Sequence, residues 1–510
     1  MIMLGLCLAM LAACFDGTIV GTIGSVLAAD LNGLELYAWM TTAYMLCETI
    51  MIPIAGKLSD IYGRKKLFLI GLTIFTVGSL FAGMSTSMEM FIACRAFQGL
   101  GGGILIPVAT AAVADLYSPS DRARMQGILG AIFGIGSGIG PLIGGYITEF
   151  STWHWCFYMN VPIAIAAGLL TIKKFPAPVG GERSKIDVKG LVALSVLLLD
   201  VLLLFEFGGS EFEWVSATSF AMIAIALALV VVFVLVERKA ENPMLAPHLI
   251  KNPTVIMGAI FMFVFGIGMM GAMMYASMFS IYVMGLTVLE AGEWSLAMIA
   301  GMMITSISSG ALVNRTGYKP WLIVGPVLCF IGLFIMSGVS VDPTMVITSS
   351  VADTYMWQYL GGMFVLGLGL GCMMSVVMSA VQNSAKPSEM GMTTSAVNLM
   401  RSVGSTMGTA IFAMVINSKL SGELLSLAPD VYANYPHDTG VLNYIATFTA
   451  DQYGNVITAF GNSVNFTFLV GGTILLCLAI VGIFFKVRKP DVDEEFEAAK
   501  MAVEGRGPEE

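Results

Sequence analysis

The sequence predicts an all-α polytopic membrane protein, and two observations carry that prediction. Hydrophobic residues make up 57% of the 510 residues and charged residues only 12%, and the mean hydropathy is +0.85. A soluble domain typically contains about 25% charged residues, so this composition excludes a soluble globular protein. The apolar residues also gather in segments of roughly 20 residues, the length of helix that spans a bilayer.

The apolar segments predict about fourteen transmembrane helices, grouped as six, two and six. We therefore expect two six-helix bundles over residues 1–178 and 241–486, with a two-helix insertion over 179–240 between them and an acidic cytoplasmic tail over 487–510. The segments lie near 2–28, 37–57, 67–85, 90–115, 125–147, 156–174, 188–207, 217–236, 254–284, 288–312, 320–339, 357–382, 391–416 and 463–486.

The lysine and arginine residues predict the orientation, because cytoplasmic connections of membrane proteins are enriched in these two residues. With the N-terminus inside, the inner connections and the tail hold 22 of the 25 Lys and Arg residues, Arg95 and Arg401 fall within helices, and only Lys419 falls outside. The longest outer connection is expected over 417–462. Met1 leads directly into an apolar segment without a basic stretch or a cleavage site, so we expect a retained first helix. Both termini are therefore predicted to be cytoplasmic, in a cell membrane.

A short segment rich in glycine and charge follows the second predicted helix and returns once in the chain. The two copies, Gly56–Lys66 and Gly310–Lys319, both read Gly-x-Leu-x-(Asp/Asn)-x-x-Gly-x-Lys. Agreement at so many spaced positions indicates a chain built of two related halves. Because each half has an even number of helices, the halves are expected to run in parallel, related by an axis along the membrane normal.

The residues of these two loops are candidates for a gate on the cytoplasmic side. Glycine permits a tight turn, and Asp60 can accept hydrogen bonds from a helix N-terminus or pair with an arginine. We expect the loops to latch the cytoplasmic side in one conformational state. The candidate gating residues are Gly56, Asp60, Gly63, Arg64, Asn314, Arg315 and Gly317.

Three further stretches make a family resemblance specific. They are Phe15–Val20, Arg95–Gly103 with the sequence Arg-Ala-Phe-Gln-Gly-Leu-Gly-Gly-Gly, and Gly127–Gly145 with its Gly-Pro pair. Together with the Gly56–Lys66 loop, they resemble the signature motifs of the major facilitator superfamily. With the fourteen predicted helices, the chain resembles the fourteen-helix drug:proton antiporters of the QacA/EmrB kind, over roughly residues 10–490.

That resemblance implies a major facilitator fold with a central cavity between two bundles, and proton-coupled efflux of hydrophobic or cationic compounds by alternating access. It also implies a multidrug exporter that is driven by the proton gradient and needs no cofactor. Export of an endogenous metabolite, lipid or peptide would use the same fold and remains an alternative. Nutrient symport is disfavoured by the antiporter-like Gly140-Pro141 pair, and a membrane sensor is the last alternative.

The fifth predicted helix carries a stripe of glycines four residues apart. Gly136, Gly140 and Gly144 would let another helix approach closely, and Pro141 can bend the helix because it removes a backbone hydrogen bond. With Gly145, these residues form a candidate joint that seals or flexes the outer side of the cavity. Plain tight packing is the alternative, and the two interpretations are compatible.

Five charged residues fall within predicted helices and are the candidates for proton coupling or substrate binding. A charge at the bilayer centre costs about 2.5–3.5 kcal/mol on insertion scales. Asp16 is the first candidate, unless it serves only to bond a neighbouring helix, and Glu48 is the second. Asp200 could instead lie near water in the outer leaflet. Arg95 and Arg401 are expected either to act on a nearby carboxylate or to form structural contacts.

Several function classes are not expected. The sequence has no nucleotide-binding loop and no catalytic constellation, so neither bound ATP nor enzymatic activity is predicted. The 8 cysteines are scattered without a CxxC pair, which disfavours a disulfide framework or a metal site. No large basic domain points to nucleic acid. We expect a monomer whose partners are protons, small molecules and membrane lipids.

Overall fold

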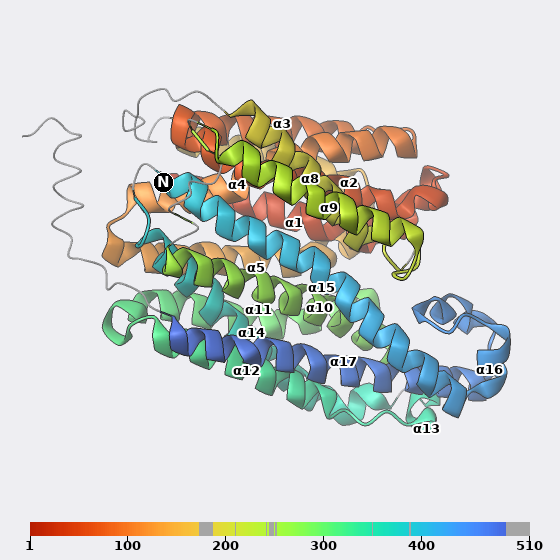
Figure 1. Cartoon of the computed structure of the whole chain (residues 1–510). Coiled ribbons are helices and arrows are strands. Elements are labelled where there is room, and N and C mark those ends of the chain that lie inside the picture. The colour runs from red at the N-terminus through yellow and green to blue at the C-terminus, as the bar shows by residue number, and fades with distance from the viewer. Residues whose placement is uncertain are drawn as a thin grey trace, which may run out of the picture.

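A computed structural model describes residues 1–172, 187–209, 211–240, 242–243, 249, 252–348, 350–386 and 389–485. Within these ranges the chain folds almost entirely into helices, and no named strand occurs. The long helices run side by side along one direction, so their connections gather at two ends (Figure 1). The predicted tail over 487–510 lies outside the described residues.

The first part of the chain contains seven helices and a short 3₁₀ turn. They are α1 (Ile2–Asp30), η1 (Leu34–Leu36), α2 (Tyr37–Tyr62), α3 (Arg64–Gly83), α4 (Met88–Leu116), α5 (Pro119–Phe150), α6 (Trp155–Tyr158) and α7 (Asn160–Ile172). The sixth predicted helix is thus divided into α6 and α7. Two further long helices follow, α8 (Val188–Phe207) and α9 (Ala217–Glu237).

The second part begins with a long helix that ends in a π-helical turn. Its elements are α10 (Pro253–Met278), η2 (Phe279–Val283), α11 (Val288–Thr316), α12 (Lys319–Ser337), α13 (Pro343–Ile347), α14 (Val351–Gln382), α15 (Met390–Leu427), α16 (Pro429–Asn434), η4 (Thr439–Thr447) and α17 (Ala450–Phe484).

The structure confirms the predicted all-α polytopic membrane fold. By length and composition, the described residues contain 13 helices that could cross a membrane, counting α6 with α7 and α10 with η2 as single spans. The remaining predicted segment is α2, which has 26 residues but is less apolar because Glu48 and several threonine and tyrosine residues interrupt it. Each of the predicted segments therefore coincides with a helix.

The bounds predicted for the longest outer connection, 417–462, are wrong, because the connection between α15 and α17 spans only 428–449. Helix α15 continues to Leu427, and α17 begins as early as Ala450, with α16 and η4 between them. The reason is packing, because Ile416, Leu420 and Leu424 repeat every fourth residue and are fully buried. The start of α17 is stabilised by a capping box in which Thr449 and Gln452 bond each other's backbone N–H groups.

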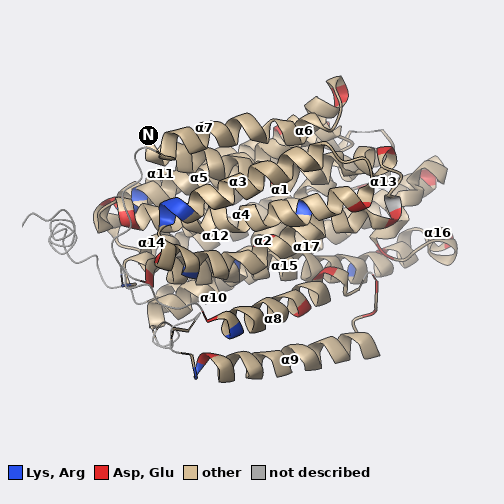
Figure 2. Cartoon of the chain, turned by 90° about the horizontal axis from the view of Figure 1, so that it is seen from above, with Lys and Arg blue, Asp and Glu red and all other residues tan. Residues whose placement is uncertain are grey.

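Contacts between helices define two halves that meet along two seams. In the first half α1 packs on α5, and α4 packs on both α2 and α3; in the second half α10 packs on α15, and α14 packs on α11 and α12. The halves meet where α5 lies along α11 and where α2 lies along α15. Helix α8 rests on α2 and α15, and α9 rests on α8 at the edge of the bundle (Figure 2).

The two ends of the bundle differ in charge (Figure 2). The end that carries the α2–α3, α4–α5, α11–α12 and α14–α15 connections is rich in Lys and Arg, and we call it the basic end. The opposite end carries α13 and α16 (Figure 1). The described cations of the basic end are Lys57, Arg64, Lys65, Lys66, Arg122, Arg124, Lys189, Arg238, Lys239, Arg315, Lys319 and Lys386.

Candidate functional site

Two of the predicted charged residues meet in the core of the first half. Asp16 of α1 and Arg95 of α4 form an ion pair, and both side chains are completely buried. Gln98 donates a hydrogen bond from Nε2 to Asp16 Oδ1 at 2.9 Å, and Asn160 of α7 donates from Nδ2 to the same oxygen at 2.8 Å. Both carboxylate oxygens of Asp16 therefore have partners, as a buried charge requires.

Arg95 is held by an aromatic ring as well as by its ion pair. Its Nη1 also donates to Gln98 Oε1 at 2.8 Å, and its guanidinium carbon lies 4.2 Å from the ring centroid of Tyr44 on α2. This arrangement is a buried cation–π contact. Among the described residues, Arg95 Nε and Nη2 and the Tyr44 hydroxyl have no hydrogen-bond partner. Arg95 thus keeps unused donors in the protein interior.

The glycines of α4 explain why α2 can bring its polar side chains so close. A Cβ atom added at Gly99 would lie 2.4 Å from the carbonyl oxygen of Tyr44, and one added at Gly103 would lie 2.3 Å from that of Glu48. Only glycine permits these contacts between two helix backbones. The Gly99 and Gly103 spacing therefore positions both Tyr44 and Glu48 beside α4.

Glu48 and Arg401 face the junction of the two halves from opposite sides. Glu48 of α2 is half-buried and Arg401 of α15 is buried, and their chain neighbours Thr49 and Ser402 share a hydrogen bond between their hydroxyls at 2.7 Å. The Arg401 guanidinium carbon lies 4.9 Å from the ring centroid of Phe133 on α5. Within the described part of the chain Glu48 forms no ion pair, and the buried Nε of Arg401 has no partner.

Asp200 lies apart from these four residues. It is on α8, and the helices against which α8 mainly packs are α2, α9 and α15. Its Oδ2 atom is buried and has no hydrogen-bond partner within the described ranges. The five predicted charged residues therefore comprise one buried ion pair (Asp16 and Arg95), two residues from opposite sides of the junction that form no ion pair, and one isolated carboxylate.

The first loop copy binds the N-terminus of α15 in the other half. Asp60 accepts hydrogen bonds from the backbone N–H groups of Gly391 at 2.9 Å and Met392 at 2.8 Å. Both groups belong to the first turn of α15, where N–H groups are unpaired and the helix dipole attracts negative charge. Gly56 contacts the same turn, since a Cβ added there would lie 2.6 Å from the Gly391 carbonyl oxygen.

Arg64 joins this contact to the end of α4. Its Nη2 lies 2.5 Å from Asp60 Oδ1, and its Nε donates to Asp115 Oδ2 at 2.9 Å. A further hydrogen bond joins Nη1 to the hydroxyl of Ser59. The Arg64 side chain is only 8% exposed, so these bonds satisfy a buried cation. Gly63 precedes Arg64 with φ of 87°, a backbone conformation that favours glycine.

The second loop copy makes a neutral version of the same contact. Asn314 donates from Nδ2 to the backbone carbonyl of Ser120, in the first turn of α5. Gly317 has φ of 80°, and Tyr318 follows it at the position that Arg64 occupies in the first copy. The hydroxyl of Tyr318 accepts from Asn383 Nδ2 at 2.8 Å. Arg315 is exposed and forms no ion pair within the described part of the chain.

The glycine stripe of α5 lies against α1. A Cβ added at Gly136 would lie 2.8 Å from Cys14 Cβ, one added at Gly140 would lie 2.0 Å from Thr18 Oγ1, and one added at Gly144 would lie 2.7 Å from Ile19. Gly145 has no atom within 4 Å of such a Cβ, so it is not a contact. Pro141 lies inside α5, which continues through it.

A second glycine stripe on α5, which sequence reasoning did not identify, lies against α11 in the other half. A Cβ added at Gly127 would lie 2.3 Å from the carbonyl oxygen of Ser306, and one added at Gly134 would lie 2.8 Å from the sulfur of Met302. Ser306 also donates from its hydroxyl to the Gly127 carbonyl at 2.8 Å. Helix α5 therefore packs closely on α1 in its own half and on α11 in the other half.

A belt of uncharged polar residues joins four helices near the basic end. Gln126 of α5 and Gln382 of α14 both donate from Nε2 to the carbonyl oxygen of Thr110 on α4, at 2.9 Å and 3.0 Å. Gln126 also donates to Gln382 Oε1 at 3.0 Å. From α15, Asn398 donates to Thr110 Oγ1 at 3.3 Å, and Thr394 accepts from Gln382 at 3.3 Å. Together with the two loops, this belt closes the basic end.

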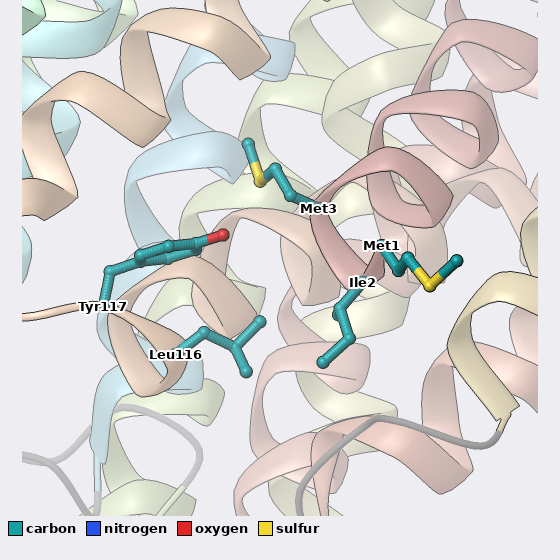
Figure 3. Close-up of a pocket in the computed structure, with 5 residues that line it drawn as sticks. All are labelled: Met1, Ile2, Met3, Leu116 and Tyr117. Carbon is teal, nitrogen blue, oxygen red and sulfur yellow. The ribbon is translucent and has the colours of Figure 1, made fainter.

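Two cavities lie away from the buried charges. One of about 280 Å³ lies at the basic end between the start of α1 and the end of α4 (Figure 3), and its lining is Met1, Ile2, Met3, Leu116 and Tyr117. None of the predicted charged residues lines it. The other has a volume of about 10 Å³ and lies between α2, α8 and α15, with a lining of Thr42, Met45, Leu46, Leu202, Glu206 and Thr406.

Sequence reasoning did not assign the uncharged partners of the site. Gln98 lies three residues after Arg95, so helical spacing alone could have placed the two side chains together. Asn160 is the first residue of α7, and nothing in the sequence shows that it reaches Asp16. The sequence carries only a weak indication of the polar belt, namely that Gln126 and Gln382 lie within otherwise apolar helices.

Comparison with known proteins identifies the family. Residues 6–409 match the family described as the Major Facilitator Superfamily. The chain is 36% identical over 422 residues to the multidrug transporter protein MdtP of Bacillus subtilis (strain 168), covering 83% of this chain and 76% of that protein. It is also 31% identical over 511 residues to multidrug resistance protein 3 of the same organism, covering 98% and 97% of the two chains.

A solved structure supports the same fold. The proton:xylose symporter XylE, bound to 6-bromo-6-deoxy-D-glucose, matches with a TM-score of 0.63 and 14% identity, covering 98% of each chain. At this identity the likeness concerns the fold alone. Since the family match spans most of the chain and the relatives match over most of their length, this protein belongs to the Major Facilitator Superfamily.

Proposed function

We propose that the protein exports hydrophobic or cationic small molecules across a cell membrane in exchange for protons, by alternating access. Membership of the superfamily implies a transporter rather than an enzyme, and two relatives are named as multidrug proteins. The proton gradient drives the cycle without a cofactor. The basic end faces the cytoplasm, in keeping with the excess of Lys and Arg there.

The observation that carries this proposal is the position of Glu48 at the junction of the halves. Asp16 is fully buried and its oxygens are bonded by Arg95, Gln98 and Asn160, so a proton could reach it only by breaking a buried ion pair. Glu48 is half-buried and has no such partners within the described part of the chain. We therefore place proton exchange at Glu48 and assign Asp16 to holding Arg95.

Coupling follows from competition for one negative charge. Deprotonated Glu48 attracts a cationic substrate and also Arg401 on the facing helix α15, where Thr49 and Ser402 hold the two helices together. When a proton neutralises Glu48, both attractions are lost together, the substrate leaves, and the halves become free to rearrange. Arg401 then has no opposite charge nearby, which favours the return of the deprotonated state once the site faces the cytoplasm.

In this conformation the transporter is closed at its basic end. The two loops and the polar belt all bridge the halves at that end. We propose that opening toward the cytoplasm requires these contacts to separate. We also propose the division into bundles over 1–178 and 241–486 with an insertion over 179–240 and a tail over 487–510. Several of these boundaries fall on or beside residues outside the described ranges.

The test is substrate-evoked proton flux in proteoliposomes that contain the full-length protein. Ethidium is added across an imposed pH gradient, and proton movement is followed for wild type, Glu48→Gln, Asp16→Asn and Asp200→Asn. We expect flux in wild type and Asp200→Asn and none in Glu48→Gln. Glu293→Gln, at an exposed position of α11, is the matched control and is expected to retain flux.

Unfolding temperatures separate loss of coupling from loss of fold. We expect Glu48→Gln to unfold near the wild-type temperature, because Glu48 has no ion pair among the described residues to lose. Flux that survives in Glu48→Gln but vanishes in a folded Asp16→Asn variant would move coupling to Asp16. Absence of flux in wild type with a panel of cationic dyes would refute proton exchange with cations and would favour export of a metabolite or lipid.

A further inference from the structure

Helix α8 of the insertion presents one regular stripe to the junction of the halves. Leu194, Leu198 and Leu202 repeat every fourth residue, so they lie on one face of the helix. All three are buried, and they form one apolar cluster with residues of α2 and α15. The partners in that cluster are Leu46, Ile52, Leu399 and Val403. Helix α8 therefore fills the groove where α2 and α15 meet.

Glu206 occupies the next position of the same stripe. It follows Leu202 by four residues, close to the end of α8 at Phe207, where a further leucine would continue the apolar contact. Its Oε1 accepts a hydrogen bond from Thr42 Oγ1 at 2.8 Å. Within the described part of the chain no Lys or Arg forms an ion pair with it. A half-buried carboxylate facing a seam between membrane helices is costly and is typically functional.

A small cavity opens beside this carboxylate. It has a volume of about 10 Å³ and lies between Thr42, Met45, Leu46, Leu202, Glu206 and Thr406. That volume is on the order of one water molecule. The polar atoms around it are a carboxylate, two hydroxyls and a thioether, all of which can accept hydrogen bonds. The remaining lining is leucine, and α8 separates it from the outermost helix α9.

This set of groups suits one chemical class. An ammonium head group is about the size of a water molecule and donates three hydrogen bonds without accepting any. The carboxylate supplies the opposite charge, and an apolar chain attached to the head group would extend out of the cavity into the surrounding lipid. A neutral alcohol would lack the charge, and a bulky quaternary ammonium would exceed the space.

We propose that Glu206 binds the ammonium head group of amphiphilic primary amines at the junction of α2, α8 and α15. Its place near the end of α8 that lies away from the basic end puts this site at the outer part of the bilayer. This role rests on the proposed function, in that the amine would be a substrate passing between the protein interior and the membrane. The binding itself does not depend on proton coupling.

The experiment measures binding to the full-length protein in nanodiscs with two probes that differ only in charge. One is a fluorescent alkylamine with a free primary ammonium, and the other is its N-acetylated, uncharged counterpart. We expect Glu206→Gln to weaken the Kd of the amine about tenfold, because a hydrogen bond to a charged group is lost. The Kd of the acetylated probe is expected to stay unchanged.

Two further variants make the outcome decisive. Glu211→Gln removes an exposed carboxylate just beyond the end of α8 and is expected to leave both Kd values unchanged. Thr42→Val removes the hydrogen bond to Glu206 but keeps the carboxylate, so its effect on amine binding is expected to be at most about threefold. Equal losses in Thr42→Val and Glu206→Gln would overturn the proposal, since Glu206 would then serve only to hold α8 in place.

The remaining outcomes are also unambiguous. An unchanged amine Kd in Glu206→Gln, or an equal loss for the charged and acetylated probes, would overturn the proposal. Proton flux that depends on Glu48 together with unchanged amine binding in Glu206→Gln would refute this site alone. Amine binding that depends on Glu206 without any proton flux would refute only the proposed coupling.

Discussion

The two loop copies, Gly56–Lys66 and Gly310–Lys319, perform one structural task with different chemistry. Each turns through a glycine with positive φ, 87° at Gly63 and 80° at Gly317. Three residues before that glycine, each places the side chain of its fifth residue on the first turn of a helix in the other half, α15 for Asp60 and α5 for Asn314. The turn is therefore the same in both copies, whereas the side-chain contacts that the two copies make are different.

The difference lies in charge and burial. In the first copy Arg64 links Asp60 to Asp115 near the end of α4, and all three belong to a largely buried ionic network. In the second copy Tyr318 meets Asn383 at the end of α14 through one neutral hydrogen bond, and Asn314 is exposed. Closure of the basic end therefore depends mainly on the first copy, because buried charges are costly to separate.

Arg64→Ala is expected to have the largest effect. It leaves the carboxylates of Asp60 and Asp115 near each other without their shared cation, which destabilises the protein by about 3–5 kcal/mol. The measurement is the free energy of unfolding in detergent, together with ethidium transport, which should be lost. Arg315→Ala in the second copy is the control, and its effect should stay within about 0.5 kcal/mol. Equal effects of the two variants would refute the inequality of the loops.

Asp60→Asn converts the first copy toward the second and should have the next largest effect. An asparagine has one acceptor oxygen for two backbone N–H groups and no charge for Arg64 or for the dipole of α15. We expect the closed basic end to lose about 1.5–3 kcal/mol. Hydrogen exchange should rise in the peptide that contains Gly391 and Met392, while the peptide around Ser120 keeps its protection. A rise at both sites would show that the loops act as one unit.

Replacing each turn glycine by alanine should destabilise the protein by a similar amount in both copies, because both glycines have positive φ. A residue with a side chain is strained at these φ values, so Gly63→Ala and Gly317→Ala should each destabilise by about 1–3 kcal/mol. At Gly317 an added Cβ would meet no atom within 4 Å, so the cost there comes from the backbone alone. Thermal unfolding of both variants checks this, and a difference above about 1 kcal/mol would contradict a common turn.

Tyr318→Phe is expected to have the smallest effect. It removes only the hydroxyl that accepts from Asn383, for a loss of about 0.5–1.5 kcal/mol in the free energy of unfolding. Tyr62→Phe is the matched control in the first copy, because Tyr62 is exposed and its ring contact with Lys66 does not need the hydroxyl. A loss as large as that of Arg64→Ala would show that the second copy contributes equally to closure.

The long helices and the repeat could be predicted because their signals are local. An apolar run such as that of α9 is helical in a membrane whatever its neighbours, since backbone N–H and C=O groups must bond within the segment. The start of α17 at Ala450 could not be predicted from hydropathy, because its first turns are polar. The same holds for the continuation of α15, where Asn417, Lys419 and Glu423 lower the hydropathy although the apolar stripe continues at Leu420 and Leu424.

Sequence alone thus determined that this chain is a helical membrane protein, and it predicted two related halves and named the charged residues within the helices that needed an explanation. Only the tertiary structure decided which charges are paired. Asp16 and Arg95 are 79 residues apart, and they are brought together by helix packing that no local pattern encodes. Glu48 and Arg401 come from opposite halves, and Glu206 reaches Thr42 across 164 residues. The cost of a buried charge depends on its neighbours, and those neighbours exist only in the folded chain.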